Sequence, residues 1–428
     1  MSEFLAPLNY DRAQDALRRL SLYTAYTPQS AALALDTLAQ CYPLVFSKTE
    51  RKTFSRDAVL LELRGANVTD PLIFTSHLDT SRDTAAGASP PTQELPLRVP
   101  LSRAHVVALL EALEELLRDG YRPGGDLFLA LSMDGLSGGE GAKSMAAYLL
   151  KRSIHPCFVL DHGGYATMDA FRSFLPKDAP LALIGVAEKG LLVGSVVAEE
   201  SRFVRPRRHP AQPVHALLTA GARLCRHPRR AALCGASQQM LAAVCRKAPY
   251  WRRAALEHPR LFFPFLRLRW HGRSVMKQFF LSETTVYGLE ASGSPTAPAR
   301  RAQMHFCQTV IPGEKTSALR QRLKRKLRNE ELDLQVMVEY EHTRRSLPQG
   351  EAWDALETAI EIQFERAVIA PCLCPFVTDS RFYAGMGERV YRFSPFLVTG
   401  QEALDGLCTV TDGALQTAVQ FFRSMLSV

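Results

Sequence analysis

Residues 126–161 read DLFLALSMDGLSGGEGAKSMAAYLLKRSIHPCFVLD. The run 126–133 is short and apolar, as expected of a buried strand, and 157–161 is a second run of this kind. Between them, residues 141–152 space their apolar side chains as a helix does. A strand, a helix and a strand in this order predict a βαβ unit with two parallel strands.

The same alternation continues upstream of this unit. Short apolar runs bounded by turn residues predict buried strands at 58–64 and 71–76, and periodic Leu and Val predict a helix at 102–118. Residues 80–100 are rich in Thr, Ala, Pro and Ser, which predicts a surface loop. These elements favour a mostly parallel central sheet with helices on both faces.

The pattern changes at about residue 187 and returns after Pro348. Residues 187–344 have the β-α-β order of a small α+β, ferredoxin-like domain. We therefore predict an α/β fold class with two domains. Residues 1–186 and 345–428 form the first, and the inserted domain 187–344 forms the second.

Composition excludes several classes of protein. The 428 residues include 46% hydrophobic and 22% charged residues, which is globular rather than disordered or collagen-like. No apolar run approaches the roughly 20 residues of a membrane span. The first residues lack a signal-peptide pattern, and nine cysteines lie without zinc-finger spacing. These features predict a cytoplasmic protein with reduced thiols and no membrane span.

Chemistry in parallel sheets lies beyond the carboxyl ends of the strands, where His77, Asp134 and Asp161 fall in this chain. A His at a strand end with a carboxylate two residues later, as in His77-Leu78-Asp79, suits a zinc ligand whose imidazole is oriented by Asp79. A histidine with a structural role would leave the same pattern, so both readings stay open.

Several segments in order resemble the co-catalytic zinc exopeptidases of the aminoacylase and carboxypeptidase S type. That family includes enzymes that join and split N-fatty-acyl amino acids. The similar segments are HLD (77–79), ALLEALEELLRDGYRP (108–123), LALSMDGLSGGEGA (129–142), FVLDHGG (158–164), AEKG (187–190), TDSRFY (378–383) and YRFSP (391–395).

The resemblance implies a zinc-exopeptidase-like catalytic domain with 187–344 as its lid. It implies amide or peptide hydrolysis by two zinc ions that share a bridging Asp. His77 and Asp161 would be zinc ligands, Asp79 would hold the imidazole of His77, and Arg381 would face the carboxylate of a small-molecule or peptide ligand. A homodimer through the lid would be compatible with this family.

The chain departs from the family pattern at four functional positions. Leu101 or Ser102 stands where the bridging Asp belongs, and Asp134-Gly135 replaces the Glu-Glu pair that supplies the general base. Cys408 occupies the place of the last His ligand, and His162 replaces the Glu after Asp161. Asp134 would be a poor general base and Cys408 a weak ligand, so we expect at most one weakly held zinc ion. A general base contributes about 10²–10⁴-fold in rate, so its loss predicts a catalytically inactive homologue.

Two alternatives remain open. The chain could be an active hydrolase with a remodelled single-metal site, or a basic anion-binding module that uses residues 202–273. The latter includes Arg205, Arg207 and Arg208, but no nucleic-acid motif accompanies them, so a nucleic-acid partner is not favoured. Structural readings also remain open for the surviving residues: Asp161 as a turn cap, Arg381 as a partner of Asp379, and Cys408 as a buried apolar side chain.

Overall fold

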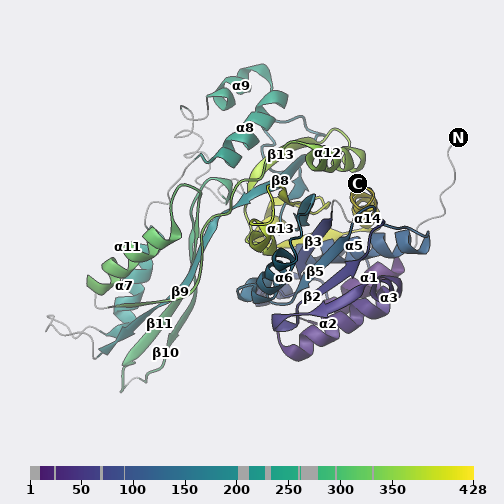
Figure 1. Cartoon of the computed structure of the whole chain (residues 1–428). Helices are drawn as coiled ribbons and strands as arrows, with labels where there is room; N and C mark the ends of the chain where they lie inside the picture. The colour runs from purple at the N-terminus through teal and green to yellow at the C-terminus, as the bar shows by residue number, and fades with distance from the viewer. Residues whose placement is uncertain are drawn as a thin grey trace. The chain divides into compact units, whose positions relative to one another are not determined.

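A computed structural model of the chain describes residues 10–23, 26–67, 71–90, 92–200, 212–226, 233–258, 261, 278–294, 296–329 and 332–428. The chain divides into two compact units, and Figure 1 shows the course of the chain through both. The first unit holds the described residues of 1–187, 235–275 and 344–428, and the second holds those of 188–234 and 276–343.

A nine-stranded sheet forms the centre of the first unit, with the order β1-β2-β5-β3-β6-β14-β8-β13 and β7 paired to β8. Its middle strands β5, β3, β6 and β14 are mutually parallel, whereas β1, β2 and β8 join by antiparallel pairs. The predicted α/β fold with a mostly parallel central sheet is therefore confirmed. The strands are β1 (Glu50–Thr53), β2 (Val59–Leu63), β3 (Leu72–His77), β5 (Leu127–Ser132), β6 (Phe158–Asp161), β7 (Tyr165–Thr167), β8 (Leu181–Glu188), β13 (Val368–Cys374) and β14 (Val390–Arg392).

Helices cover both faces of this sheet. On one face, α5 packs against β3 and against α1, α3 and α14. On the other face, α6 packs its Ala142, Met145 and Leu149 against buried side chains of β2, β3 and β5. The helices of this unit are α1 (Asp11–Leu20), α2 (Pro28–Cys41), α3 (Pro43–Lys48), α4 (Arg82–Gly87), α5 (Leu101–Arg118), α6 (Glu140–Lys151), α8 (Gly235–Lys247), α9 (Tyr250–Glu257), α12 (Glu351–Gln363), α13 (Gly400–Asp405) and α14 (Asp412–Leu426), with short 3₁₀ turns η1 (Ser55–Asp57), η2 (Gly135–Ser137) and η5 (Asp379–Tyr383).

The segment 80–100 is not the surface loop that its composition predicts. It contains α4 and the strand β4 (Leu97–Pro100), which pairs with β15 (Leu407–Val410) in a separate two-stranded sheet. Leu97 and Val99 are buried, because pairing with a strand more than 300 residues away turns them into the core. Alternation over only four residues, next to prolines, is too short a signal to reveal such a partner.

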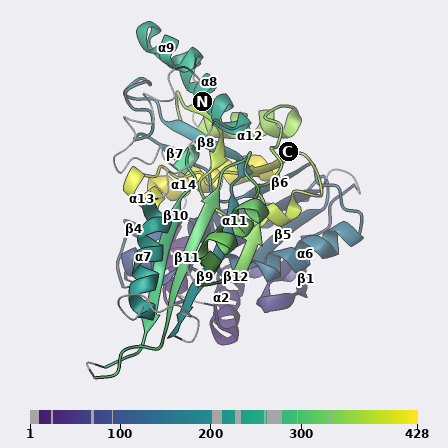
Figure 2. The same ribbon diagram turned by 90° about the vertical axis from the view of Figure 1, so that its left-hand side faces the viewer.

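The second unit is a four-stranded antiparallel sheet of order β10-β11-β9-β12, visible with its helices in Figure 2. Helices α7 and α11 pack on one face, and Leu192, Leu217, Phe306 and Leu319 are among the buried residues of the resulting core. The elements are β9 (Gly190–Glu199), α7 (Pro213–Arg226), β10 (Thr284–Ala291), β11 (Arg301–Val310), α11 (Thr316–Asn329) and β12 (Asp333–Tyr340).

Two helices within the predicted inserted domain 187–344 belong to the first unit instead of the second. Helix α8 packs against β13 of the large sheet, and α9 packs against α8, so both helices group with the first unit. Ala236, Met240, Leu241 and Val244 of α8 are buried in this arrangement. The helical pattern of these residues was readable from the sequence, but the sheet that they cover was not.

Candidate functional site

Three parallel strands bring the candidate residues to one edge of the large sheet. In the register of β3 with its neighbours, Thr75 pairs with Asp161 of β6, and His77 pairs with Ser132 of β5. His77, Asp161 and Ser132 are all buried. The structure thus brings His77 and Asp161 to the same edge of the sheet.

Protein groups already occupy both carboxylate oxygens of Asp161. Its Oδ1 accepts hydrogen bonds from the backbone N–H of His162 at 2.7 Å and lies 2.8 Å from the His162 Nδ1 atom. Its Oδ2 accepts the backbone N–H of Ser380 at 2.7 Å. Asp161 therefore caps the turn that follows β6 and also holds the His162 ring.

Ser102, one of the two residues that the resemblance aligns with the bridging carboxylate, lies beside this group. The hydroxyl of Ser76 donates to the carbonyl oxygen of Ser102 at 3.3 Å and lies 3.2 Å from His162 Nδ1. The carbonyl oxygen of Ser102 and the ring of His162 thus both contact the Ser76 hydroxyl.

His77 keeps the partner that the sequence assigns to it. Its Nδ1 lies 3.0 Å from Oδ1 and 3.0 Å from the carbonyl oxygen of Asp79, and its ring meets the His162 ring edge-on at 4.7 Å between centroids. The two oxygens of Asp79 also accept the backbone N–H groups of Gly135 and Leu136 at 2.9 and 3.0 Å. These contacts fix the His77 ring against the start of η2.

Gly135 lies directly under that ring. A Cβ atom at position 135 would lie 2.5 Å from Cγ and 2.6 Å from Cβ of His77, closer than real Cβ contacts come. In the family pattern this is part of the Glu-Glu segment, so the space in which such a side chain would begin is filled by His77. No side chain fits at position 135 while His77 keeps this position.

Asp379, in η5, is a buried carboxylate for which the sequence suggests only a pairing with Arg381. It accepts a hydrogen bond from the hydroxyl of Ser132, and its charge interacts with those of His77 and Asp161. The segment TDSRFY, quoted for Arg381, contains Asp379, so the signal was present in the sequence. Its proximity to His77 depends on where η5 crosses the sheet edge, which local pattern does not reveal.

The charged groups in this buried cluster shift one another's pKa values. Burial opposes the charge of His77, but the carboxylates of Asp79, Asp379 and Asp161 raise its pKa to about 9. Burial raises the pKa of Asp379 to about 7, with the Asp161 charge adding to the rise. Burial also opposes ionisation of Asp161, yet the charge and hydrogen bond of His162 lower its pKa. A protonated His77 thus offsets the charge of the neighbouring carboxylates.

His105 is a third buried histidine near His162, and the centroids of the two rings lie 6.4 Å apart. Its Nδ1 contacts the Ser394 hydroxyl at 3.1 Å, and its ring packs edge-on against Phe422. Burial lowers its pKa to about 3, and the charge of His162 contributes, so His105 is neutral.

Asp134 accepts hydrogen bonds from the first turn of a helix rather than from the buried cluster around His77 and Asp161. Its carboxylate accepts the backbone N–H of Glu140 at 2.9 Å and that of Gly141 at 3.2 Å, at the first turn of α6. A carboxylate at a helix N-terminus satisfies backbone donors that otherwise lack partners, and it complements the helix dipole. Asp134 therefore caps α6.

Cys408 and Arg381 complete the sequence-predicted set. Cys408 is buried in β15 opposite Val99, and burial raises the pKa of its thiol with a contribution from Glu402. Its electrostatic neighbour is thus Glu402 rather than His77 or Asp161. Arg381 is half-buried in η5, two residues after Asp379.

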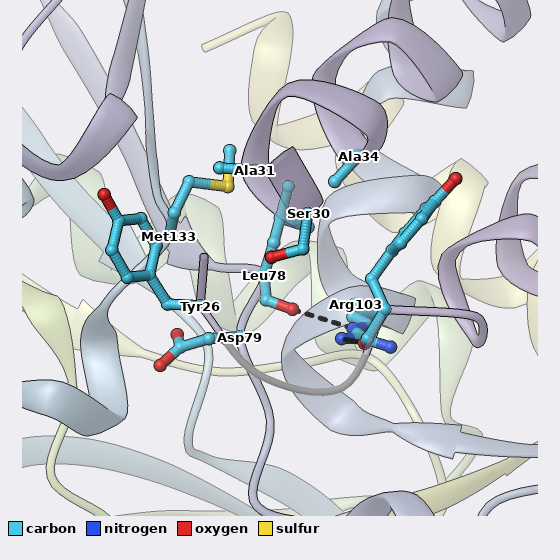
Figure 3. Close-up of a pocket in the computed structure, with 9 residues that line it drawn as sticks. Tyr26, Ser30, Ala31, Ala34, Leu78, Asp79, Arg103 and Met133 are labelled. Carbon is cyan, nitrogen blue, oxygen red and sulfur yellow. Dashed lines mark hydrogen bonds between the residues drawn. The ribbon is translucent and has the colours of Figure 1, made fainter. Parts of the chain in front are cut away.

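A small cavity borders the site on the side of Asp79, and Figure 3 shows the residues around it. Its volume is about 20 Å³, room for about one water molecule. Arg103 closes it by donating to the carbonyl oxygens of Leu78 at 2.8 Å and Leu20 at 2.6 Å. Arg103 thereby satisfies backbone acceptors, and the cavity is too small for a substrate.

A catalytic zinc ion takes about three protein ligands and leaves one position open. Across the part of the chain that the structure describes, no three His, Cys, Asp or Glu side chains are arranged to hold a metal ion. The oxygens of Asp161 are engaged, Asp134 caps a helix, and Cys408 lies in another sheet. These residues do not fit the two zinc ions that the resemblance implies.

Two other predictions from the sequence concern the basic segment and a membrane span. Arg205, Arg207 and Arg208 of the basic segment fall outside the described residues. Within the described ranges, no helix combines the length and the apolar character needed to cross a bilayer.

Comparisons with curated proteins identify relatives. N-fatty-acyl-amino acid synthase/hydrolase PM20D1 of Homo sapiens is 26% identical over 306 residues, which are 69% of this chain and 59% of the human protein. Probable carboxypeptidase S-like 2 of Dictyostelium discoideum is 23% identical over 305 residues, 70% of this chain and 58% of that protein. The chain thus spans less than two thirds of the length of these relatives.

Solved structures share the fold. Human carnosine dipeptidase 1 has a TM-score of 0.67 at 12% identity, covering 98% of this chain and 97% of that chain. The Bacillus subtilis protein YXEP, a dinuclear metal-binding peptidase of the M20 family, has a TM-score of 0.52 at 12% identity, covering 98% and 97%. The sequence model of peptidase family M20/M25/M40 matches residues 101–427, which is most of the chain. This chain therefore belongs to peptidase family M20/M25/M40, a family of peptide and amide hydrolases.

Proposed function

We propose that this chain is a catalytically inactive member of the M20 family, which keeps the fold and acts by binding rather than by hydrolysis. The observation that carries the proposal is the contact between His77 and Gly135. The His77 ring fills the space in which a side chain at position 135 would begin. The backbone N–H of Gly135 donates to Asp79, which anchors the turn beneath the His77 ring.

The engagement of Asp161 supports the same proposal. Three N–H groups, from His162 and Ser380, lie within 2.8 Å of its oxygens. A metal ion would have to displace these charge-assisted hydrogen bonds, which are each stronger than neutral ones. Relatives of this chain include a protein named as a synthase/hydrolase of N-fatty-acyl amino acids, so a small carboxylate near Arg381 is the ligand class that we propose for this region.

The test combines metal content with activity. Purified protein, incubated with zinc and then dialysed, is assayed on N-acyl amino acids and dipeptides, and its zinc content is measured by elemental analysis. His77→Ala is compared with His155→Ala, since His155 is exposed and stands outside the site. We expect no turnover above the His77→Ala variant and no stoichiometric zinc.

Two results would contradict the proposal. Turnover that disappears in His77→Ala and persists in His155→Ala, with two zinc ions per chain, would assign the family reaction to this protein. One zinc ion per chain, lost in both His77→Ala and Asp161→Ala, together with turnover, would assign a single-metal hydrolase.

A further inference from the structure

A second pocket lies in the first unit, apart from the residues of the candidate site. Its volume is about 210 Å³, and it opens between the segment 344–347, the turn after η5 and strand β14. None of His77, Asp161 or Arg381 lines it. At about 30 Å³ per water molecule, it has room for about seven waters or a short organic molecule.

Three guanidinium groups line this pocket. Arg392 of β14 lines the pocket although it is only 1% exposed, and its Nη1 donates to the carbonyl oxygen of Val390 at 3.0 Å. Arg344 and Arg345 are exposed and stand at the outer side. Glu388, also exposed, is the one carboxylate among the lining residues, so the lining carries three positive charges against one negative charge.

The framework around these side chains is ordered by short contacts. The hydroxyl of Ser346 donates to the carbonyl oxygen of Val390 at 2.8 Å and accepts its N–H at 3.0 Å, which ties the segment 344–347 to β14. The guanidinium of Arg345 packs over Gly235, where a Cβ atom would collide with its Nη1. A side chain held in this way loses less conformational freedom when it binds a ligand.

The remaining lining is apolar. Leu347, Ala384 and Val390 contribute hydrocarbon surface to the same lining as the three arginines. A ligand that combines two negative charges with a short hydrocarbon chain would match this lining. Arginine recognises carboxylates through its planar fork of two parallel N–H donors.

We propose that this pocket binds a short dicarboxylate, with one carboxylate at Arg392 and the other at Arg344 and Arg345. The net lining charge matches a dianion, and the volume accommodates a chain of about four or five carbon atoms. This site depends neither on a metal ion nor on hydrolysis, so its failure and that of the proposed function are independent.

The experiment is calorimetric titration of the full chain with succinate and with glutarate, repeated with acetate and inorganic phosphate. We expect a dicarboxylate to bind more tightly than either control anion, and Arg345→Gln and Arg344→Gln each to weaken it about tenfold. Arg389→Gln is the matched control, because Arg389 is exposed, adjacent in sequence and absent from the lining. It should leave the affinity unchanged.

Three results would overturn the proposal. One is no dicarboxylate binding at millimolar concentration. Another is an equal loss in Arg389→Gln, which would indicate attraction by net charge alone. The third is phosphate binding as tight as that of the dicarboxylates, which would assign a different ligand chemistry. Circular dichroism of each variant verifies that the exposed substitutions leave the fold intact.

Discussion

Gly135 shows how one residue decides what a site can contain. It lacks a side chain, its N–H is bound by Asp79, and the His77 ring lies where its Cβ would be. The three residues therefore form one packed unit, in which the size of one constrains the position of another. A longer side chain at position 135 would therefore also require the His77 ring to move.

We predict that Gly135→Ala destabilises the protein by about 1–3 kcal/mol, because the added methyl group must displace the ring of His77 from its contacts with Asp79. Urea denaturation of the variant measures the change in the free energy of unfolding. Gly124→Ala is the matched control, since a Cβ there meets nothing within 4 Å. An equal loss in both variants would mean that His77 does not fill the space at position 135.

Residue types at strand ends were readable from the sequence, but their partners were not. The end of β3 places His77 at the same edge of the sheet as Asp161, in a register that pairs Thr75 with Asp161. The sequence could not show that Asp134 caps α6, because the alternative of an aligned general base uses the same residue at the same turn. Nor could it place Asp379 beside His77, since that proximity joins segments about 300 residues apart.

At the scale of elements, β2 and α6 are joined by a partly buried ion pair. Glu62 of β2 is 1% exposed and accepts two hydrogen bonds from Arg152, at 2.7 and 2.9 Å, just after the end of α6. Burial opposes the charge of Glu62, but the hydrogen bonds and charge of Arg152 lower its pKa below the ordinary 4.5. This pairing fixes the end of α6 on the sheet.

Glu62→Gln should cost about 1.5–3 kcal/mol near neutral pH, the contribution of a hydrogen bond to a charged group. A lowered pKa stabilises the fold above the unfolded-state pKa, and this stability is lost as the pH falls through the folded-state pKa. The difference between wild type and variant should therefore shrink below about pH 4.5.

Urea denaturation at neutral and acidic pH measures this difference. Asp178→Asn, in an exposed pair with Arg366, serves as the control and should change little at either pH. A difference that persists undiminished in acid would show that the Glu62 carboxylate is not its source.

Long periodic helices and strands with continuous apolar runs were predicted well, and several short strands without such a run were missed. The helix predicted at 102–118 is α5 (Leu101–Arg118), and the strand predicted at 71–76 is β3 (Leu72–His77). By contrast, β4, β14 and β15 have three or four residues each, too few for a periodic signal. Their existence depends on distant partners, so only the folded chain reveals them.

At the scale of the whole molecule, each of the two units has its own core. Phe306 is buried among the side chains that join the four-stranded sheet to α7 and α11. Phe128 is buried between the large sheet and α6. Units with separate cores can unfold in separate transitions.

We predict that Phe306→Ala and Phe128→Ala each remove about 3–5 kcal/mol from one unit. In differential scanning calorimetry, the two variants should lower the midpoints of different transitions, because each deletes a ring from a different core. A common shift of a single transition in both variants would show that the units unfold together.

Strand β14 lies between β6 and β8 in the large sheet, although it comes from residues 390–392. A ribosome synthesises β6 and β8 long before it reaches this segment. Until Arg392 has emerged, the nascent chain has no strand to pair with that side of β6, and its backbone donors and acceptors stay open to other chains. The middle of the sheet is therefore completed last, and premature termination anywhere before residue 390 leaves an exposed edge rather than a smaller finished domain.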